Sequence, residues 1–243
     1  MIRTFIFFDL ETTGLIGKNF MPKVTEMSLI AVSRNAICDT TDILPRVLHK
    51  LILPIHPNVR ISEGIETLTG LSNTNLEEVQ HFNCEVYNLI INFVKRQIAP
   101  ICFVAYNGNK FDYPIFLSEL KNINKNFCED ILSIDMLHLI KEFFSTKQSG
   151  MEINAAYTAT SNSFRAENKR GAIARRKLDF TNSKPTNFKL SSVCKHIFGT
   201  DPENIHNAEG DCLSMIRCAT QLGNSFVQWA DYKAVPLINH SKQ

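Results

Sequence analysis

The stretch Thr4–Glu11 reads TFIFFDLE and contains the pattern that decides the fold. Its first five residues are apolar or β-branched, as is typical of a buried strand. Asp9 and Glu11 then stand at alternate positions, so in an extended chain both carboxylates point to the same face. Two carboxylates beside a buried strand need a compensating cation, or their pKa values rise. We therefore expect an oxygen-ligand site for a hard ion such as Mg²⁺ or Mn²⁺, with a plain strand-end turn as the alternative.

The rest of the chain predicts a mixed sheet that helices cover. Besides Thr4–Phe8, the segments rich in aliphatic and β-branched residues are Val24–Ser33, Arg46–Leu53, Ile101–Ala105 and, as an edge strand, Ile131–Asp135. Apolar residues recur at helical spacing in Asn83–Gln97, Tyr113–Leu120, Met136–Phe144, Lys189–Phe198 and Glu209–Leu222. We expect the first three strands to form an antiparallel meander. Because strands come first and helices dominate later, the order predicts an α/β fold with a central, mixed, five-stranded sheet flanked by helices.

Composition excludes several classes of protein. The chain has 243 residues, 44% of them hydrophobic, which suits one well-filled domain over residues 1–243. Its seven cysteines are scattered and form no C-x-x-C pair, which disfavours a disulfide scaffold and a zinc site and fits free thiols in a reducing compartment. The sequence shows neither a signal peptide nor a run of about 20 apolar residues. We expect a soluble protein of the cytoplasm, the nucleus or both, with no membrane partner.

Basic charge is concentrated in one segment. The whole chain carries 26 basic and 24 acidic residues and a net charge of +2, which argues neither for nor against a polyanionic partner. Residues 146–189, in contrast, hold nine basic and three acidic side chains in a stretch rich in Ser, Thr, Asn and Ala. We interpret residues 146–187 as a flexible basic insertion, which is an arrangement that suits binding to phosphate chains.

Two further segments supply carboxylates where helices are expected to begin. Asn107–Asp112 reads NGNKFD and delivers Asp112 shortly after a central strand. Taken alone, Asp112 is better explained as a helix N-cap than as a catalytic group. His206–Asp211 reads HNAEGD and supplies an imidazole and a carboxylate, although Glu209 and Asp211 could simply favour the helix dipole. Each signal is weak alone, but three signals in order, each at a strand end or a helix start, together favour one shared site.

These three segments resemble the three exonuclease motifs of the DEDDh superfamily, in the order Phe7–Leu15 (FFDLETTGL), Asn107–Asp112 and His206–Asp211. Three more segments resemble the three-prime repair exonucleases (TREX) in particular, namely Pro22–Met27 (PKVTEM), Pro45–Leu51 (PRVLHKL) and Leu68–Ser72 (LTGLS). The resemblance covers nearly the whole chain except residues 146–184. It implies an RNase H-like α/β fold, two Mg²⁺ ions per active site for which Mn²⁺ can substitute, a homodimer, and degradation of single-stranded or frayed DNA from a free 3′ end.

The resemblance also implies a role for each matched residue. Asp9 would bridge both ions, Glu11 and Asp211 would bind the ion that activates water, and Asp112 would complete the site. His206 would be the general base, a task that suits an imidazole because it exchanges protons near neutral pH. The related tyrosine subclass places its phenol four residues before the last aspartate, where this chain has an asparagine. His206, five residues before Asp211, therefore indicates the histidine subclass.

The substrate contacts that the resemblance implies are Glu11, Thr12, Leu15, Leu68, Phe111 and Asp211. The backbone of Glu11 and Thr12 would hold the terminal nucleotide, and Phe111 would offer an aromatic surface near the scissile bond. Leu15 and Leu68 would act as apolar wedges against the base, and simple packing in the core is an equal alternative for both.

Three arginines of the basic insertion, Arg170, Arg175 and Arg176, would follow the DNA backbone. A solvated linker or a nuclear import signal explains them nearly as well. Tyr106 and Asn109 stand where many relatives carry His and Asp, so substrate handling near the site can differ.

The sequence thus predicts a metal-dependent 3′-to-5′ DNA exonuclease that releases nucleoside 5′-monophosphates. One alternative is a DEDDh nuclease that acts on RNA or in proofreading. Another is a catalytically silent nucleic-acid-binding module, which need not retain all of Asp9, Glu11, Asp112, His206 and Asp211.

Overall fold

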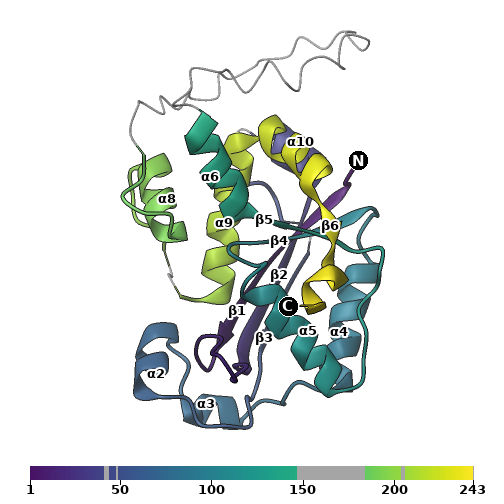
Figure 1. Ribbon diagram of the computed structural model, residues 1–243, viewed down its shortest axis with the longest axis vertical. Coiled ribbons are helices and arrows are strands. Elements are labelled where there is room, and N and C mark those ends of the chain that lie inside the picture. The colour runs from purple at the N-terminus through teal and green to yellow at the C-terminus, as the bar shows by residue number, and fades with distance from the viewer. Residues whose placement is uncertain (41–43, 48, 147–183, 204–205, 243) are drawn as a thin grey trace.

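The computed structural model describes residues 1–40, 44–47, 49–146, 184–203 and 206–242 (Figure 1). At the centre of this part of the chain is a mixed sheet of six strands in the order β3-β2-β1-β4-β5-β6. The strands are β1 (Thr4–Thr12), β2 (Val24–Ser33), β3 (His49–Pro54), β4 (Ile101–Ala105), β5 (Leu132–Asp135) and β6 (Val235–Pro236). Strand β2 is antiparallel to both β1 and β3, β4 is parallel to β1 and β5, and β6 is antiparallel to β5.

The expected α/β fold and its antiparallel meander are confirmed, but the described sheet has six strands instead of five. The additional strand, β6, is two residues long, which is too short for an alternating pattern to appear in the sequence. Since β6 pairs with β5, the expectation of an edge strand at Ile131–Asp135 is wrong. Strand β1 continues to Thr12, beyond the expected Thr4–Phe8, and β3 begins at His49 instead of Arg46.

Helices cover both faces of the sheet (Figure 1). One face carries α6 (Met136–Thr146), α8 (Leu190–Phe198), α9 (Ala208–Leu222) and α10 (Asn224–Lys233), and the other carries α4 (Cys84–Lys95) and α5 (Asp112–Asn122). Phe5 and Phe7 pack in the first of the two cores, whereas Ile6 and Phe8 pack in the second. Because β1 is buried on both faces, its first half is a continuous apolar run and does not alternate with polar residues.

Three short helices have no counterpart in the sequence prediction, namely α1 (Arg34–Asp39), α2 (Glu63–Thr69) and α3 (Asn73–Glu77). They have six, seven and five residues, so an apolar period of 3.6 cannot show itself in them. Each begins at a serine whose side chain accepts a backbone N–H of the first turn, at Ser33, Ser62 and Ser72. Helix α10 is also absent from the prediction because it follows α9 directly, with a turn at Gly223 (φ 53°) between them.

Residues 147–183 lie outside the described residues, so the interpretation of residues 146–187 as a basic insertion stays a prediction. Among the residues that the structure does describe, no helix combines the length and the apolar character needed to cross a bilayer. The last described element, η3 (Leu237–Lys242), packs against α5.

Candidate active site

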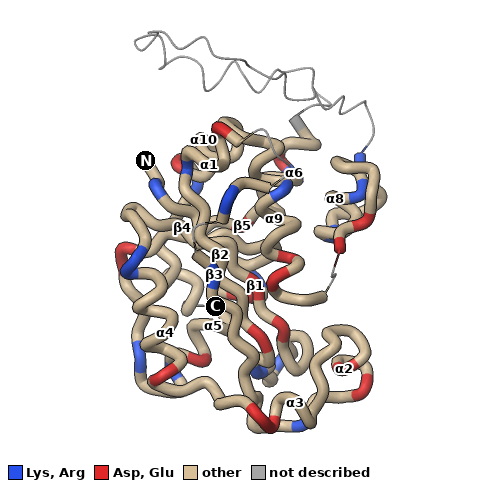
Figure 2. The backbone as a smooth tube through the Cα atoms, turned by 180° about the vertical axis from the view of Figure 1, so that it is seen from behind, with Lys and Arg blue, Asp and Glu red and all other residues tan. Residues whose placement is uncertain are grey.

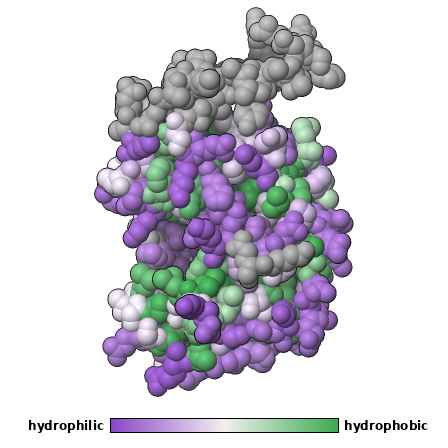
Figure 3. All heavy atoms as spheres, in the orientation of Figure 1, coloured by the Kyte–Doolittle hydropathy of each residue, from purple (hydrophilic) through white to green (hydrophobic). Residues whose placement is uncertain are grey.

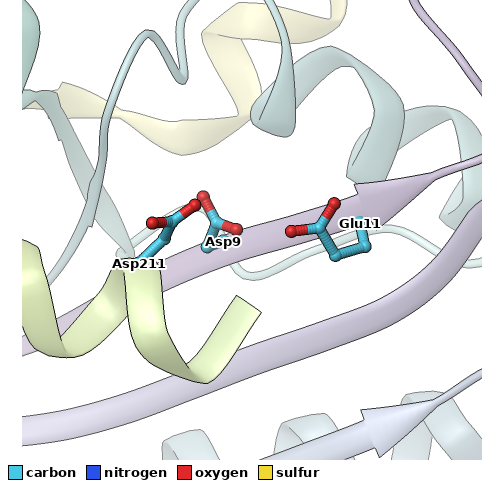
Figure 4. Close-up of side chains that lie close together, drawn as sticks. All are labelled: Asp9, Glu11 and Asp211. Atoms are coloured by element: carbon cyan, nitrogen blue, oxygen red, sulfur yellow. The ribbon is translucent and has the colours of Figure 1, made fainter. Parts of the chain in front are cut away.

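The second half of β1 carries two carboxylates on one side of the sheet. Asp9 lies opposite Ser28 and Glu11 lies opposite Glu26 in the antiparallel ladder between β1 and β2. The ladder becomes irregular between Glu11 and Thr12, where the strand ends. Because side chains alternate along a strand, Asp9 and Glu11 project together to the side on which α9 begins (Figure 4).

A third carboxylate, that of Asp211, reaches the same place from the first turn of α9. One oxygen of each of Asp9, Glu11 and Asp211 can be chosen so that the three atoms lie within 4.8 Å of one another. Figure 4 shows these side chains around one space, two of them on β1 and one on α9. The structure therefore brings together residues that are about 200 positions apart in the sequence, because α9 packs on the central strand. Their catalytic roles stay predictions.

Asp112 approaches this group from the start of α5, after the loop that follows β4. The loop reverses at Asn107, whose φ is 64°, and at Gly108, where a Cβ would lie only 2.4 Å from a neighbouring side-chain carbon. Asp112 is 2% exposed, and its Oδ1 accepts a hydrogen bond of 3.2 Å from the Leu10 N–H. Because the N-cap of α5 is Phe111, and Asp112 is the first residue of the helix, the alternative that Asp112 serves as the N-cap is wrong.

Burial raises the pKa values of all four carboxylates, and neighbouring negative charges raise those of Asp9, Glu11 and Asp112 further. The pKa of Asp9 lies well above its ordinary value because of burial and then because of the charges of Asp112, Asp211 and Glu11. Burial, followed by the charge of Asp211, raises the pKa of Glu11 to about 8. Burial also raises the pKa of Asp112 to about 8 and that of Asp211 to about 6. A bound cation would favour the ionised forms, so the free energy stored in this repulsion is available to metal binding.

The donor atoms suit a hard divalent cation. All of them are carboxylate oxygens, the type of ligand that Mg²⁺ and Mn²⁺ prefer. Two ligand oxygens on opposite sides of one Mg²⁺ lie about 4 Å apart. The three carboxylate oxygens of the group lie within 4.8 Å of one another, which is close to that distance. The backbone view in Figure 2 shows acidic positions gathered around β1 and the start of α9. The residues present therefore fit the expected metal.

His206 lies just before α9, beside this carboxylate group. Its side chain is exposed, and its φ of 63° places it in the left-handed region that few non-glycine residues adopt. Burial raises the pKa of Asp211, and His206 opposes that rise through its charge and its backbone N–H. The next residue, Asn207, caps α9 by accepting the Gly210 N–H at 3.1 Å. The turn at His206 thus places an imidazole near Asp211 at the solvent side of the site.

Two carboxylates that the sequence prediction missed hold the loops of the site. Glu26 of β2 is 8% exposed and accepts the N–H of Ala208, the first residue of α9, at 2.9 Å. Asp135, at the end of β5, is 3% exposed and accepts the N–H groups of Asn107 at 2.8 Å and Asn109 at 3.3 Å. The available sequence signal for both is a single acidic residue in a strand whose other residues are apolar, Ser or Thr.

The residues expected to contact substrate have different environments. Thr12 is 6% exposed, and its Oγ1 donates a hydrogen bond of 2.7 Å to the Gly14 carbonyl, so its side chain stabilises the turn after β1. Leu15 and Leu68 are 79% and 48% exposed, which makes the core-packing alternative wrong for both. Phe111 is partly buried against the core beneath α5. Figure 3 shows apolar surface at the end of the molecule where α2, which carries Leu68, is found. Arg170, Arg175 and Arg176 lie outside the described residues.

Comparison with known proteins finds relatives by sequence and by fold. No family model matches the chain. It is 28% identical over 247 residues to three-prime repair exonuclease 1 of Bos taurus, covering 97% of this chain and 68% of that protein. It is 29% identical over 239 residues to three prime repair exonuclease 2 of Mus musculus, covering 95% of this chain and 88% of that protein.

Two solved structures show the same fold. One is E. coli exonuclease I in complex with a dT13 oligonucleotide, with a TM-score of 0.62, 15% identity and coverage of 95% of this chain. This chain spans 43% of the length of that exonuclease. The other is the nuclease domain of 3′hExo, described as a DEDDh family member and bound to rAMP, with a TM-score of 0.60 and 13% identity over 91% of this chain and 92% of that one. The chain is thus similar in sequence to the three-prime repair exonucleases and shares its fold with a DEDDh family member.

Proposed function

We propose that the chain is a metal-dependent 3′-to-5′ DNA exonuclease. It would hydrolyse phosphodiester bonds at a free 3′ end that is single-stranded or frayed, and it would release nucleoside 5′-monophosphates. The observation that carries the proposal is the meeting of Asp9, Glu11 and Asp211 within 4.8 Å, with the buried Asp112 alongside. The names of the relatives support the direction of cleavage, since both are three-prime repair exonucleases that match nearly the whole of this chain.

The carboxylates would hold two divalent cations in the proposed reaction. Mg²⁺ ions bound in this way supply a nucleophilic water at neutral pH and stabilise the anionic phosphorus centre and the leaving 3′ oxygen. Asp9 would serve both ions, and its electrostatic interaction with Asp112, Asp211 and Glu11 supports this role. Glu11 and Asp211 would orient the water together with its ion.

His206 would act as the general base. Its side chain is exposed and lies next to Asp211 in charge interaction, so it can take a proton at the site and pass it to solvent. The left-handed turn at this residue costs roughly 1–3 kcal/mol, a type of strain that is concentrated at functional sites. A His206→Ala variant should therefore lose most of its turnover while it keeps the carboxylate group and its affinity for Mn²⁺.

A direct assay uses the purified full chain and one oligonucleotide sequence, prepared as DNA and as RNA and labelled at the 5′ end. The expected result is a ladder that shortens from the 3′ end of DNA with Mg²⁺ or Mn²⁺ and does not form with EDTA. Asp9→Asn should abolish the ladder. Asp130→Asn, which changes an exposed carboxylate in the turn before β5, should leave it intact and serves as the matched control.

Other outcomes of this assay select the other candidates. Faster degradation of RNA than of DNA would favour an exoribonuclease. This candidate is considered because the nuclease domain of 3′hExo, which has the same fold, is bound to rAMP. Binding of either oligonucleotide without any metal-dependent shortening would favour a silent nucleic-acid-binding module. Shortening from the 5′ end would contradict the proposed direction.

The proposal includes a homodimer. Strand β3 (His49–Pro54) lies at one end of the sheet order and pairs with β2 along one side. Among the described residues no strand pairs with its other side, which could therefore pair with a second copy. This strand covers most of the segment Arg46–Leu53 that the sequence suggests as an interface. Light scattering coupled to gel filtration should give twice the chain mass of 27.6 kDa. A proline at Leu51 on β3 should disfavour the dimer if the strand forms the interface.

A further inference from the structure

Glu26 occupies an unusual place beside the candidate site. It lies directly opposite Glu11 in the ladder between β1 and β2, with Met27 and Val24 buried on the same strand. Glu26 is 8% exposed, so its carboxylate is largely removed from water. A buried carboxylate next to another carboxylate is costly unless it makes strong hydrogen bonds, so its presence requires a physical reason.

The reason visible in the structure is a hydrogen bond to the start of α9. The Ala208 N–H donates to Glu26 Oε2 at 2.9 Å, and this contact joins residues that are 182 positions apart. Ala208 is the first residue of α9, and the first N–H groups of a helix have no partner within the helix itself. A carboxylate at this position also interacts favourably with the positive end of the helix dipole. Asn207 satisfies the Gly210 N–H in the same turn.

The location of this contact relates it to catalysis. Ala208 lies between His206 and Asp211, so whatever holds Ala208 determines where both side chains stand relative to β1. A second link between this turn and the sheet is the ion pair of Lys50 with Glu209, whose side chains are 57% and 32% exposed. Exposed ion pairs contribute little to holding a position. Glu26 is therefore the stronger of these two links between α9 and the sheet.

We propose that Glu26 is a positioning residue of the active site, an inference that rests on the proposed exonuclease function. Its carboxylate holds the first turn of α9 against β2, so that Asp211 and His206 face Asp9 and Glu11. It acts through the backbone of Ala208, whose N–H donates to its Oε2, while Asp9, Glu11 and Asp211 form the group of mutually close carboxylates.

The test compares Glu26→Ala with Glu26→Gln. Glutamine loses the charge and exchanges one oxygen for an NH₂ group but keeps an acceptor oxygen for the Ala208 N–H, whereas alanine removes the acceptor. Partners that orient metal ligands typically contribute 10–100-fold to metal affinity or activity. We therefore expect Glu26→Ala to lower kcat and Mn²⁺ affinity by about 10–100-fold with little change in KM for the oligonucleotide, and Glu26→Gln to restore most of both.

Two control variants separate positioning from general loss of stability. Asp231→Ala removes a carboxylate that accepts the Ile2 N–H at 2.8 Å beyond the start of β1, far from Asp9 and Glu11 along the strand. It should lower the melting temperature and leave kcat and Mn²⁺ affinity unchanged. Glu209→Gln removes the exposed ion pair from the same turn of α9 and should also leave both unchanged.

Two readouts do not depend on turnover. Calorimetric titration with Mn²⁺ alone measures metal affinity, and amide hydrogen exchange of the segment around Ala208 measures whether the first turn of α9 is held. Exchange there should be faster in Glu26→Ala and close to wild type in Glu26→Gln. If the wild type proves inactive on every oligonucleotide, the proposed function fails, yet these two measurements still decide the role of Glu26.

The inference is overturned if folded Glu26→Ala keeps wild-type kcat and Mn²⁺ affinity, or if Glu26→Gln is as impaired as Glu26→Ala. Should Glu26→Ala fail to fold, the glutamine variant decides alone. Near-normal kcat and near-normal exchange at Ala208 in that variant support positioning through the hydrogen bond, and a loss of kcat with normal exchange contradicts it.

Discussion

Replacing Glu11 by glutamine should make the metal-free protein more stable and remove its activity. The pKa of Glu11 is raised from 4.5 to about 8, first by burial and then by the charge of Asp211. A carboxyl whose folded-state pKa is raised contributes its full stability below about pH 4.5 and loses it as the pH rises through about 8. At pH 9 the folded protein therefore contains an ionised, partly buried glutamate next to other carboxylates. Glutamine has nearly the same shape without that charge.

The size of the effect follows from two independent routes. Each pKa unit corresponds to about 1.4 kcal/mol, so the rise to about 8 implies roughly 5 kcal/mol of lost stability at pH 9. Two unit charges at the 4.8 Å limit of the group repel by roughly 3.5 kcal/mol at an effective dielectric constant of about 20. We therefore expect Glu11→Gln to stabilise the metal-free protein by about 3–5 kcal/mol at pH 9 and by almost nothing at pH 4.

Thermal unfolding in EDTA at pH 4, 7 and 9 measures this difference. For a chain of this size 1 kcal/mol shifts the melting temperature by about 2–4 °C, so a gain of about 10 °C at pH 9 is expected. Saturating Mg²⁺ should stabilise the wild type more than the variant, since glutamine offers a weaker ligand, and the advantage of the variant should shrink or reverse. A variant that is less stable than wild type in EDTA at pH 9, or that gains equally from Mg²⁺, would refute the reasoning.

Three further predictions test other parts of the site. Burial raises the pKa of Asp112 to about 8. The wild type in EDTA should therefore lose stability against urea between pH 5 and pH 9, and saturating Mg²⁺ should reduce that loss. Stability that increases with pH would contradict this prediction. The Leu15 and Leu68 side chains are 79% and 48% exposed, so Leu15→Ala and Leu68→Ala should change the free energy of unfolding by no more than about 0.5 kcal/mol. Both variants should raise KM for a single-stranded oligonucleotide. A large loss of stability would show that these side chains pack in the core after all. Gly108→Ala, whose Cβ would lie 2.4 Å from that of Ala105, should lower the free energy of unfolding by about 1–3 kcal/mol in urea titrations, and an unchanged midpoint would show that the loop can move.

Much of the sheet could be predicted because the signal is local. The apolar run before Asp9 marks a strand buried on both faces, and the spacing of Asp9 and Glu11 places both carboxylates on one side wherever the strand lies. The helix that carries Asp211 also has a local start signal, because Asn207 caps it. Strand β6 and the short helices α1, α2 and α3 could not be predicted, because elements of two to seven residues have no period to detect.

The sequence by itself determined which groups the chain brings to the site, since the motif residues Asp9, Glu11, Asp112, His206 and Asp211 are set by their residue types and their order. Only the tertiary structure decided which of them meet and how each is held. The distance limit of 4.8 Å among three carboxylates, the exposure of Leu15 and Leu68, and the contact of Glu26 with Ala208 all depend on how β1, β2 and α9 pack. The physical reason is that burial, repulsion between charges and long-range hydrogen bonds arise between segments that are distant in sequence, and no local pattern records them.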